Sequence, residues 1–168
     1  MARTGGMIAA LVLGAGVAAA QGWDAPTDPP TGAAAEPARG TPARSDLLDH
    51  LRPVIAYHLG APLEFRVVHL RSDGARAFAM LVAQRPGGQR IAIEATPMVQ
   101  RDGEPPSLID GSLGAGPAVQ AFLVRRGGQW QVLSYAVGAT DAWWVGEPWC
   151  KTYGFAPVMP DDACRENP

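Results

Sequence analysis

The sequence predicts an α+β domain in which one N-terminal helix packs on a curved antiparallel sheet of four to five strands. Apolar residues recur at helical spacing between positions 47 and 59. The period then changes to two, and turn sequences separate the successive apolar runs. One helix followed by a meander of strands is the order typical of the α+β class, with the helix covering one face of the sheet.

The first twenty residues have the pattern of a secretory signal peptide. Arg3 precedes an apolar run over residues 7–20 that closes on three alanines, so we expect cleavage before Gln21. This run is shorter than the roughly 20 residues that a membrane span needs, and an uncleaved N-terminal anchor is the alternative interpretation. The sequence therefore predicts a periplasmic or secreted protein with a signal peptide over 1–20 and no membrane span after cleavage.

Residues 21–44 have the composition of a spacer. They are rich in Ala, Pro, Gly and Thr, and bulky apolar side chains are almost absent after Trp23. Such a segment cannot bury enough surface to offset the entropy that is lost on ordering. We therefore expect a flexible linker over 21–44 and a single folded domain over 45–168.

The predicted helix begins at Ser45, a residue type that caps helix N-termini, and ends at Gly60, which Pro62 follows. Its apolar positions share one face: Leu47, Leu48, Leu51, Val54, Ile55 and Leu59. Pro53 lies inside this pattern, where it removes a backbone hydrogen bond and crowds the preceding turn. We expect one kinked helix, and a helix that begins near Pro53 after a separate first turn is the alternative.

Five runs of strand character follow the helix. Short turns rich in Gly, Pro or Asp separate most of them, at 72–74, 86–88 and 127–128. The predicted strands cover residues 63–71, 75–85, 89–96, 119–126 and 129–137. The second run is apolar on both faces, which indicates a central strand covered twice or a strand that shows one face to a partner. A homodimer through the face formed by Phe78, Phe122 and Val124 is therefore one interpretation.

Two segments outside the strands form the candidate binding surface. The Gly- and Pro-rich loop over about 97–117 has a length that in small domains is usually functional or mobile, and we expect its part around Gly103 to Gly116 to belong to the surface. The tail that starts at Gly138 carries Trp143, Trp144 and Trp149, and aromatic side chains near a loop-rich edge anchor protein partners or sugar faces. The alternative is that these tryptophans close the open end of the sheet as core.

Cys150 and Cys164 predict one disulfide. They are the two cysteines of the chain, an even count in a protein expected to be exported. The bond would close a loop of about 15 residues and stabilise the fold by about 3 kcal/mol in the chain-entropy description. Two free thiols or a metal pair are the alternatives, and the spacing is too wide for a C-x-x-C redox motif.

The sequence predicts no catalytic residue, no cofactor and no metal site. Asp141 would serve as a general base at the mouth of the sheet if it were buried, and a turn or capping aspartate is the alternative. His50 and His58 are eight residues apart, which offsets them by roughly 80° on a helix, and His69 has no motif around it. The formal net charge of -2 gives no basic surface for nucleic acid.

Five segments carry a resemblance to known sequences: LRP at 51–53, GAPLEF at 60–65, QRPGG at 84–88, RRGGQWQV at 125–132 and VGATD at 137–141. They cover most of the folded domain and resemble a set of uncharacterised exported bacterial proteins. The order of helix, hairpin, strand, long loop and hairpin resembles the cystatin-like and NTF2-like α+β group. The resemblance implies the fold and export, and it implies nothing catalytic.

These observations together favour a small exported binding or accessory module without catalytic activity. Its partner would be a protein or another component of the cell envelope. The rival interpretation is a small NTF2-like enzyme or ligand carrier, with a pocket between helix and sheet and with Asp141 or His69 at its mouth. A deep polar cavity in that position would favour the rival, and a filled core would count against it.

Overall fold

The computed structural model describes residues 27–110 and 116–165, and the predicted signal peptide lies outside these residues. The fold is the predicted α+β class, with one long helix, α1 (Pro42–Leu59), against a four-stranded antiparallel sheet. The strands follow chain order across the sheet: β1 (Glu64–Ser72), β2 (Arg76–Gln84), β3 (Ala118–Arg126) and β4 (Gln129–Val137). Short helical turns lie between and after them: η1 (Pro86–Gly88), η2 (Ile93–Ala95), α2 (Pro97–Gln100), α3 (Pro106–Ile109) and η3 (Ala156–Val158).

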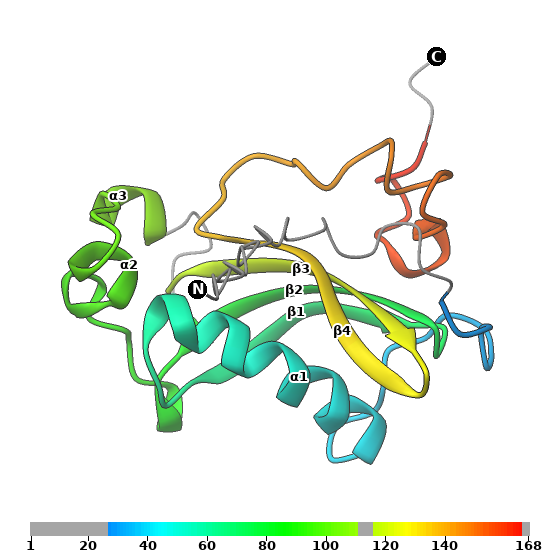
Figure 1. The fold of residues 1–168 in the computed structure, drawn as a ribbon, viewed down its shortest axis with the longest axis horizontal. Helices are drawn as coiled ribbons and strands as arrows, with labels where there is room; N and C mark the ends of the chain where they lie inside the picture. The colour runs from blue at the N-terminus through cyan, green and yellow to red at the C-terminus, as the bar shows by residue number, and fades with distance from the viewer. Residues whose placement is uncertain (1–26, 111–115, 166–168) are drawn as a thin grey trace, which may run out of the picture.

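Figure 1 shows three layers. α1 lies on one face of the sheet, and the C-terminal segment, residues 138–165, lies across the opposite face, which we call the second face. α2 and α3 lie at one end of the sheet. The N-terminal strap, residues 27–41, lies at the other end, beside the turns that join β1 to β2 and β3 to β4.

The N-cap of α1 lies four residues before the predicted position. Thr41 is the N-cap, and its hydroxyl oxygen accepts a hydrogen bond from the backbone N–H of Arg44. Pro42 occupies the first helical turn, where its fixed φ favours the helix and its missing N–H is not needed, so the expected start at Ser45 is wrong. The prediction of one helix that contains Pro53 is confirmed, as is the end at Gly60.

The space between α1 and the sheet is filled by apolar side chains. The helix contributes Leu47, Leu51, Ile55 and Leu59, each at most 2% exposed. The sheet opposes them with Leu81 and a row of alanines on β2 and β3, and small side chains let a helix approach the sheet closely. One apolar core of the domain lies here, and most of the sheet residues that face the helix come from β2 and β3.

The predicted strand over 89–96 is wrong. Gln89 forms a single bridge with Arg85, and the chain then turns through η2 into α2. The alternating pattern instead buries Ile91 and Ile93 in the core beneath α1. A third strand has no place beside β2, because β1 and β3 already occupy its two edges. The sheet therefore has four strands.

The described part of the predicted linker contacts the folded domain. Asp28 donates its backbone N–H to the carbonyl of Arg125 at 2.8 Å, and its carboxylate accepts the N–H groups of Gly127 and Gly128 at 2.9 and 2.8 Å. Further along, Ala35 forms an antiparallel bridge with Ser72. Residues 28–35 are thus held by the backbone of two turns. Among the helices of the described residues, none has both the length and the hydropathy needed to cross a bilayer.

Candidate binding surface on the second face of the sheet

The second face is apolar and is covered by the chain's own C-terminal segment. Phe78 from β2 and Phe122 and Val124 from β3 are at most 2% exposed and pack against residues of this segment. The face that the sequence offered for a homodimer is therefore not available to a second copy. β2 is apolar on both faces because it is a central strand that is covered on both sides.

Trp149 belongs to the core of this layer. Its ring stacks on Phe122 with centroids 3.9 Å apart and an interplanar angle of 7°, and the residue is 7% exposed. The ring of Phe155 meets Phe122 edge-on at 4.7 Å. Of the three tryptophans predicted as binding residues, Trp149 thus follows the alternative interpretation and anchors the segment to the sheet.

Trp143 and Trp144 are both half-buried. The Trp143 ring meets Phe122 edge-on at 5.7 Å, and its Nε1–H donates a hydrogen bond to Oε1 of Gln120 at 3.3 Å. The Trp144 ring lies 5.2 Å from Phe78. These neighbours both reach the sheet because they lie in a turn, where adjacent side chains do not alternate as they do in a strand. Trp144 makes no hydrogen bond within the described residues and presents the rest of its ring to solvent.

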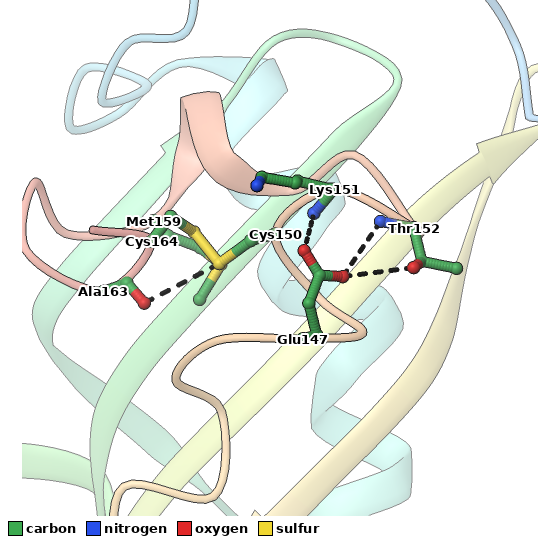
Figure 2. Close-up of a disulfide and its surroundings, with 7 residues drawn as sticks. All are labelled: Glu147, Cys150, Lys151, Thr152, Met159, Ala163 and Cys164. Atoms are coloured by element: carbon green, nitrogen blue, oxygen red, sulfur yellow. Dashed lines mark hydrogen bonds between the residues drawn. A yellow bond between two sulfur atoms is a disulfide. The ribbon is translucent and has the colours of Figure 1, made fainter. Parts of the chain in front are cut away.

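The disulfide predicted between Cys150 and Cys164 is confirmed, with Cα atoms 5.5 Å apart. Figure 2 shows its surroundings, in which the Cys150 sulfur lies 3.6 Å from the carbonyl oxygen of Ala163. In the chain-entropy description the closed loop contributes about 3 kcal/mol. The bond joins the turn after Trp149 to the end of the described chain.

A carboxylate fixes the turn that leads into the disulfide. Glu147 accepts the backbone N–H groups of Lys151 and Thr152 at 3.0 and 3.1 Å and the Thr152 hydroxyl at 3.1 Å (Figure 2). Hydrogen bonds from Thr152 and Lys151 lower the pKa of the exposed Glu147 carboxyl below its ordinary value. The C-terminal segment is thus held by the disulfide, by the turn that Glu147 caps and by stacked aromatic rings.

A shallow pocket of about 160 Å³ opens beside Trp144. Its floor comes from Met80 and Gln120 on the sheet, and its rim comes from Thr140, Asp141 and Trp144. Asp141 is exposed at this rim, so the burial that a general base would need is not there. The structure brings two predicted site residues, Asp141 and Trp144, to one opening.

Gln120 is a residue that the sequence reasoning missed. It is 5% exposed, and its amide N–H₂ faces the carbonyl of Ala139 at 3.4 Å while its oxygen receives the Trp143 indole N–H. A single polar side chain inside the apolar run AVQAFLV was the available signal. A buried amide in such a run needs hydrogen-bond partners, and here the C-terminal segment supplies them.

The loop over 97–117 and the C-terminal segment do not form one continuous surface patch. Leu108 of α3 is 61% exposed, but α3 lies at the end of the sheet away from the disulfide (Figure 1). The two predicted parts meet near Gly138, whose backbone approaches Leu108 and Ile109. Residues 111–115 of this loop lie outside the described residues.

The two residues that the rival interpretation places at a pocket mouth between helix and sheet, Asp141 and His69, lie on the second face instead. A pocket of about 690 Å³ does open where the start of α1 meets the strap and the ends of the strands, but neither residue lines it. His69 Nε2 is 2.9 Å from the carbonyl oxygen of Val158. Within residues 27–110 and 116–165, no three His, Cys, Asp or Glu side chains come together as a metal site would require.

No protein-family model matches this chain, and neither a curated protein nor a solved structure matches it.

Proposed function

We propose that this chain is a small exported binding or accessory module without catalytic activity, and that its contact surface is the pocket rim formed by Thr140, Asp141 and Trp144. The observation that supports it most is the partly exposed Trp144 ring beside an open pocket, on a segment fixed by a disulfide. A rigid aromatic side chain loses little conformational entropy on binding and forms large contacts, which is why such residues anchor interfaces.

The size and chemistry of the pocket limit what it accepts. Its volume of about 160 Å³ lies below the range of roughly 300–1,000 Å³ that holds whole small-molecule ligands. We infer that it receives one protruding group of a larger partner, a protein or another cell-envelope component. The exposed Asp141 carboxylate at the rim favours a cationic or hydrogen-bond-donating group, and the Trp144 face favours its apolar part.

Export and the finer fold assignment also belong to this proposal. The disulfide between Cys150 and Cys164 is consistent with an oxidising compartment outside the cytoplasm. One long helix against a four-stranded antiparallel meander is in keeping with the cystatin-like and NTF2-like group. Because that kind of fold carries many unrelated functions, the proposal depends on the Trp144 surface and not on the fold.

The test is site-specific crosslinking to partners in the periplasm, followed by recovery of the crosslinked species. Trp144→Ala and Asp141→Ala should each reduce recovery at least tenfold, because one removes the apolar contact and the other the charge. Val145→Ala is the matched control, since Val145 is 44% exposed and adjacent but does not line the pocket. Recovery that is the same for Trp144→Ala and for the unchanged chain would contradict the proposal, provided near-UV circular dichroism shows that both are folded.

A further inference from the structure

The N-terminal strap pairs with the outer edge of β1 at the end of the strand and then turns away from it. β1 is the first strand of the sheet, so β2 pairs with only one of its two edges. On the other edge the strap residue Ala35 exchanges two backbone hydrogen bonds with Ser72, at 3.0 and 2.9 Å. This contact shows that the edge accepts an extended chain in antiparallel pairing.

The strap leaves the edge directly after Ala35. Arg44 of α1 holds the next two residues, because its guanidinium contacts the Glu36 carboxylate at 2.8 Å and the Pro37 carbonyl at 2.9 Å. Proline at this position also lacks the N–H that a continuing strand would need. Within the described residues, no other chain segment pairs with the outer edge of β1 from Glu64 to Leu70.

Two grooves follow this vacant edge, one on each face of the sheet. The groove between α1 and β1 has a volume of about 310 Å³, and Leu48, Phe65 and Val67 give it an apolar lining. The groove on the other face has a volume of about 390 Å³ and lies beside the second half of the strand, where Val68, His69 and Arg71 line it together with Glu36 and Asp161. A strand paired with residues 64–67 would direct alternate side chains into the groove beside α1 and the others toward the opposite face.

Beside the first half of the edge, arginines outnumber carboxylates, since the Glu64 carboxylate on β1 accepts the backbone N–H of Gly87 while three arginines line the groove. Arg39, Arg44 and Arg66 line the groove beside α1, and of the three only Arg44 forms a salt bridge in the described part of the chain. Arg66 is exposed on the strand itself. Carboxylates on an added strand would therefore find guanidinium partners without displacing existing ones.

We propose that the outer edge of β1 binds an extended segment of a partner protein in which acidic and apolar residues alternate, added to the sheet as a fifth strand. Its apolar side chains occupy the groove on Leu48, Phe65 and Val67, and its carboxylates face Arg66. A one-residue bulge between Val67 and His69 restricts regular pairing to the first half of β1, and such bulges also disfavour edge-to-edge association of two copies. The site is distinct from the Trp144 surface and does not depend on it.

The test uses a blocked hexapeptide of alternating glutamate and valine as the probe, with backbone amide NMR of the full mature chain as the readout. We expect shifts at residues 64–70 and around Leu48 in the groove, and a dissociation constant that Arg66→Glu raises at least tenfold. Arg90→Glu is the matched charge control, because Arg90 is exposed in the loop after η1. The Lys-Val analogue should bind at least tenfold more weakly, and Trp144→Ala should bind the probe unchanged.

Backbone methylation of the peptide separates strand addition from nonspecific charge attraction. Alternate N–H groups of a strand point toward its neighbour, so N-methylation of one alternate set should abolish binding while N-methylation of the other set preserves it. Equal effects of the two methylated peptides, or shifts that map to the Trp144 pocket, would overturn the proposal. Concentration-dependent dimerisation through β1 in sedimentation would also overturn it, since a second copy would then be the occupant.

Discussion

At the scale of single residues, His58 in the last turn of α1 has one ring nitrogen with a hydrogen-bond partner and one buried without a partner in the described part of the chain. Its Nε2 lies 2.7 Å from the hydroxyl oxygen of Tyr135 on β4, and Nδ1 is the buried nitrogen. Burial, and then the nearby charge of Arg101, lower the pKa of this imidazole below its ordinary 6.5, against the opposite pull of Asp102. The folded protein therefore favours neutral His58.

The lowered pKa of His58 predicts that the stability of the fold depends on pH. Because the pKa of His58 is lower in the folded than in the unfolded chain, the unfolded chain binds the proton more readily between the two values. The free energy of unfolding should be unaffected by this group above about pH 6.5 and should fall as the pH drops from there toward the folded pKa. Urea unfolding at a series of pH values measures it.

His58→Gln is the comparison for that measurement, since its amide reaches the position of Nε2 and does not titrate. The variant should lose part of the decline in stability between pH 6.5 and acid, relative to the unchanged chain. His50→Gln is the matched control, because His50 is on the same helix and contacts Asp46 near its first turns. If the stability of His58→Gln and of the unchanged chain fell in parallel with pH, the loss of stability at low pH would not come from the His58 imidazole.

At the scale of elements, the sequence was informative wherever a pattern reflects local burial. The apolar spacing of α1, the alternation in β1 and the alanine row of β2 predicted the helix and its covered face, because each follows from neighbours along the chain. The run over 89–96 alternates in the same way, yet it buries Ile91 and Ile93 without being a strand. Alternation reports burial, whereas a strand that follows β2 in a hairpin also needs a vacant edge on β2, and β1 and β3 occupy both.

The contact between α3 and the start of the C-terminal segment is another element-level feature, and it depends on one glycine. Gly138 has φ +77°, and a Cβ added there would lie 2.1 Å from the carbonyl oxygen of Leu108 and 2.7 Å from Cα of Ile109. Gly146 has a similar φ of +80° but nothing within 4 Å. The two positions therefore share the cost of a left-handed side chain and differ in steric room.

We expect Gly138→Ala to lower the free energy of unfolding by about 1 to 3 kcal/mol more than Gly146→Ala. The extra cost arises because α3 or the segment must move to relieve the contact with Leu108. Chemical denaturation of the two variants measures the difference, and hydrogen exchange at the amides of α3 shows whether that helix loosens. Equal destabilisation by the two substitutions would mean that α3 does not pack firmly on this turn.

At the scale of the whole molecule, the candidate site depends on how the termini return to the sheet. Sequence reasoning identified Trp143, Trp144, Trp149 and the disulfide as the features of the tail. It could not rank the tryptophans, because the burial of Trp149 depends on contact with Phe122, which precedes it by 27 residues. Gln120 shows the same limit, since its partners belong to a segment that folds back over it.

The N-terminal strap was the harder feature to predict. Its composition lacks apolar bulk, and the entropy argument that suggested a flexible linker counts only what side chains can bury. The strap is instead held largely by hydrogen bonds to backbone groups, from Asp28 to Gly127 and Gly128 in the turn after β3 and between Ala35 and Ser72 at the end of β1. No hydropathy pattern encodes such contacts, because their partners are backbone atoms that any residue supplies.

The strap therefore gives the last prediction, on the anchoring of the N-terminal region as a whole. Asp28→Ala removes the acceptor of two hairpin N–H groups, and we expect it to lower the free energy of unfolding by about 1 kcal/mol, since these bonds are exposed. The sharper readout is local: hydrogen exchange at Gly127 and Gly128 should become faster, and proteases should cleave residues 29–34 more readily. Asp161→Ala, at an aspartate whose side chain is 88% exposed, is the matched control. Unchanged exchange at both glycines in Asp28→Ala would show that this carboxylate does not hold the strap, and the ordering of the region would then depend on the bridge between Ala35 and Ser72.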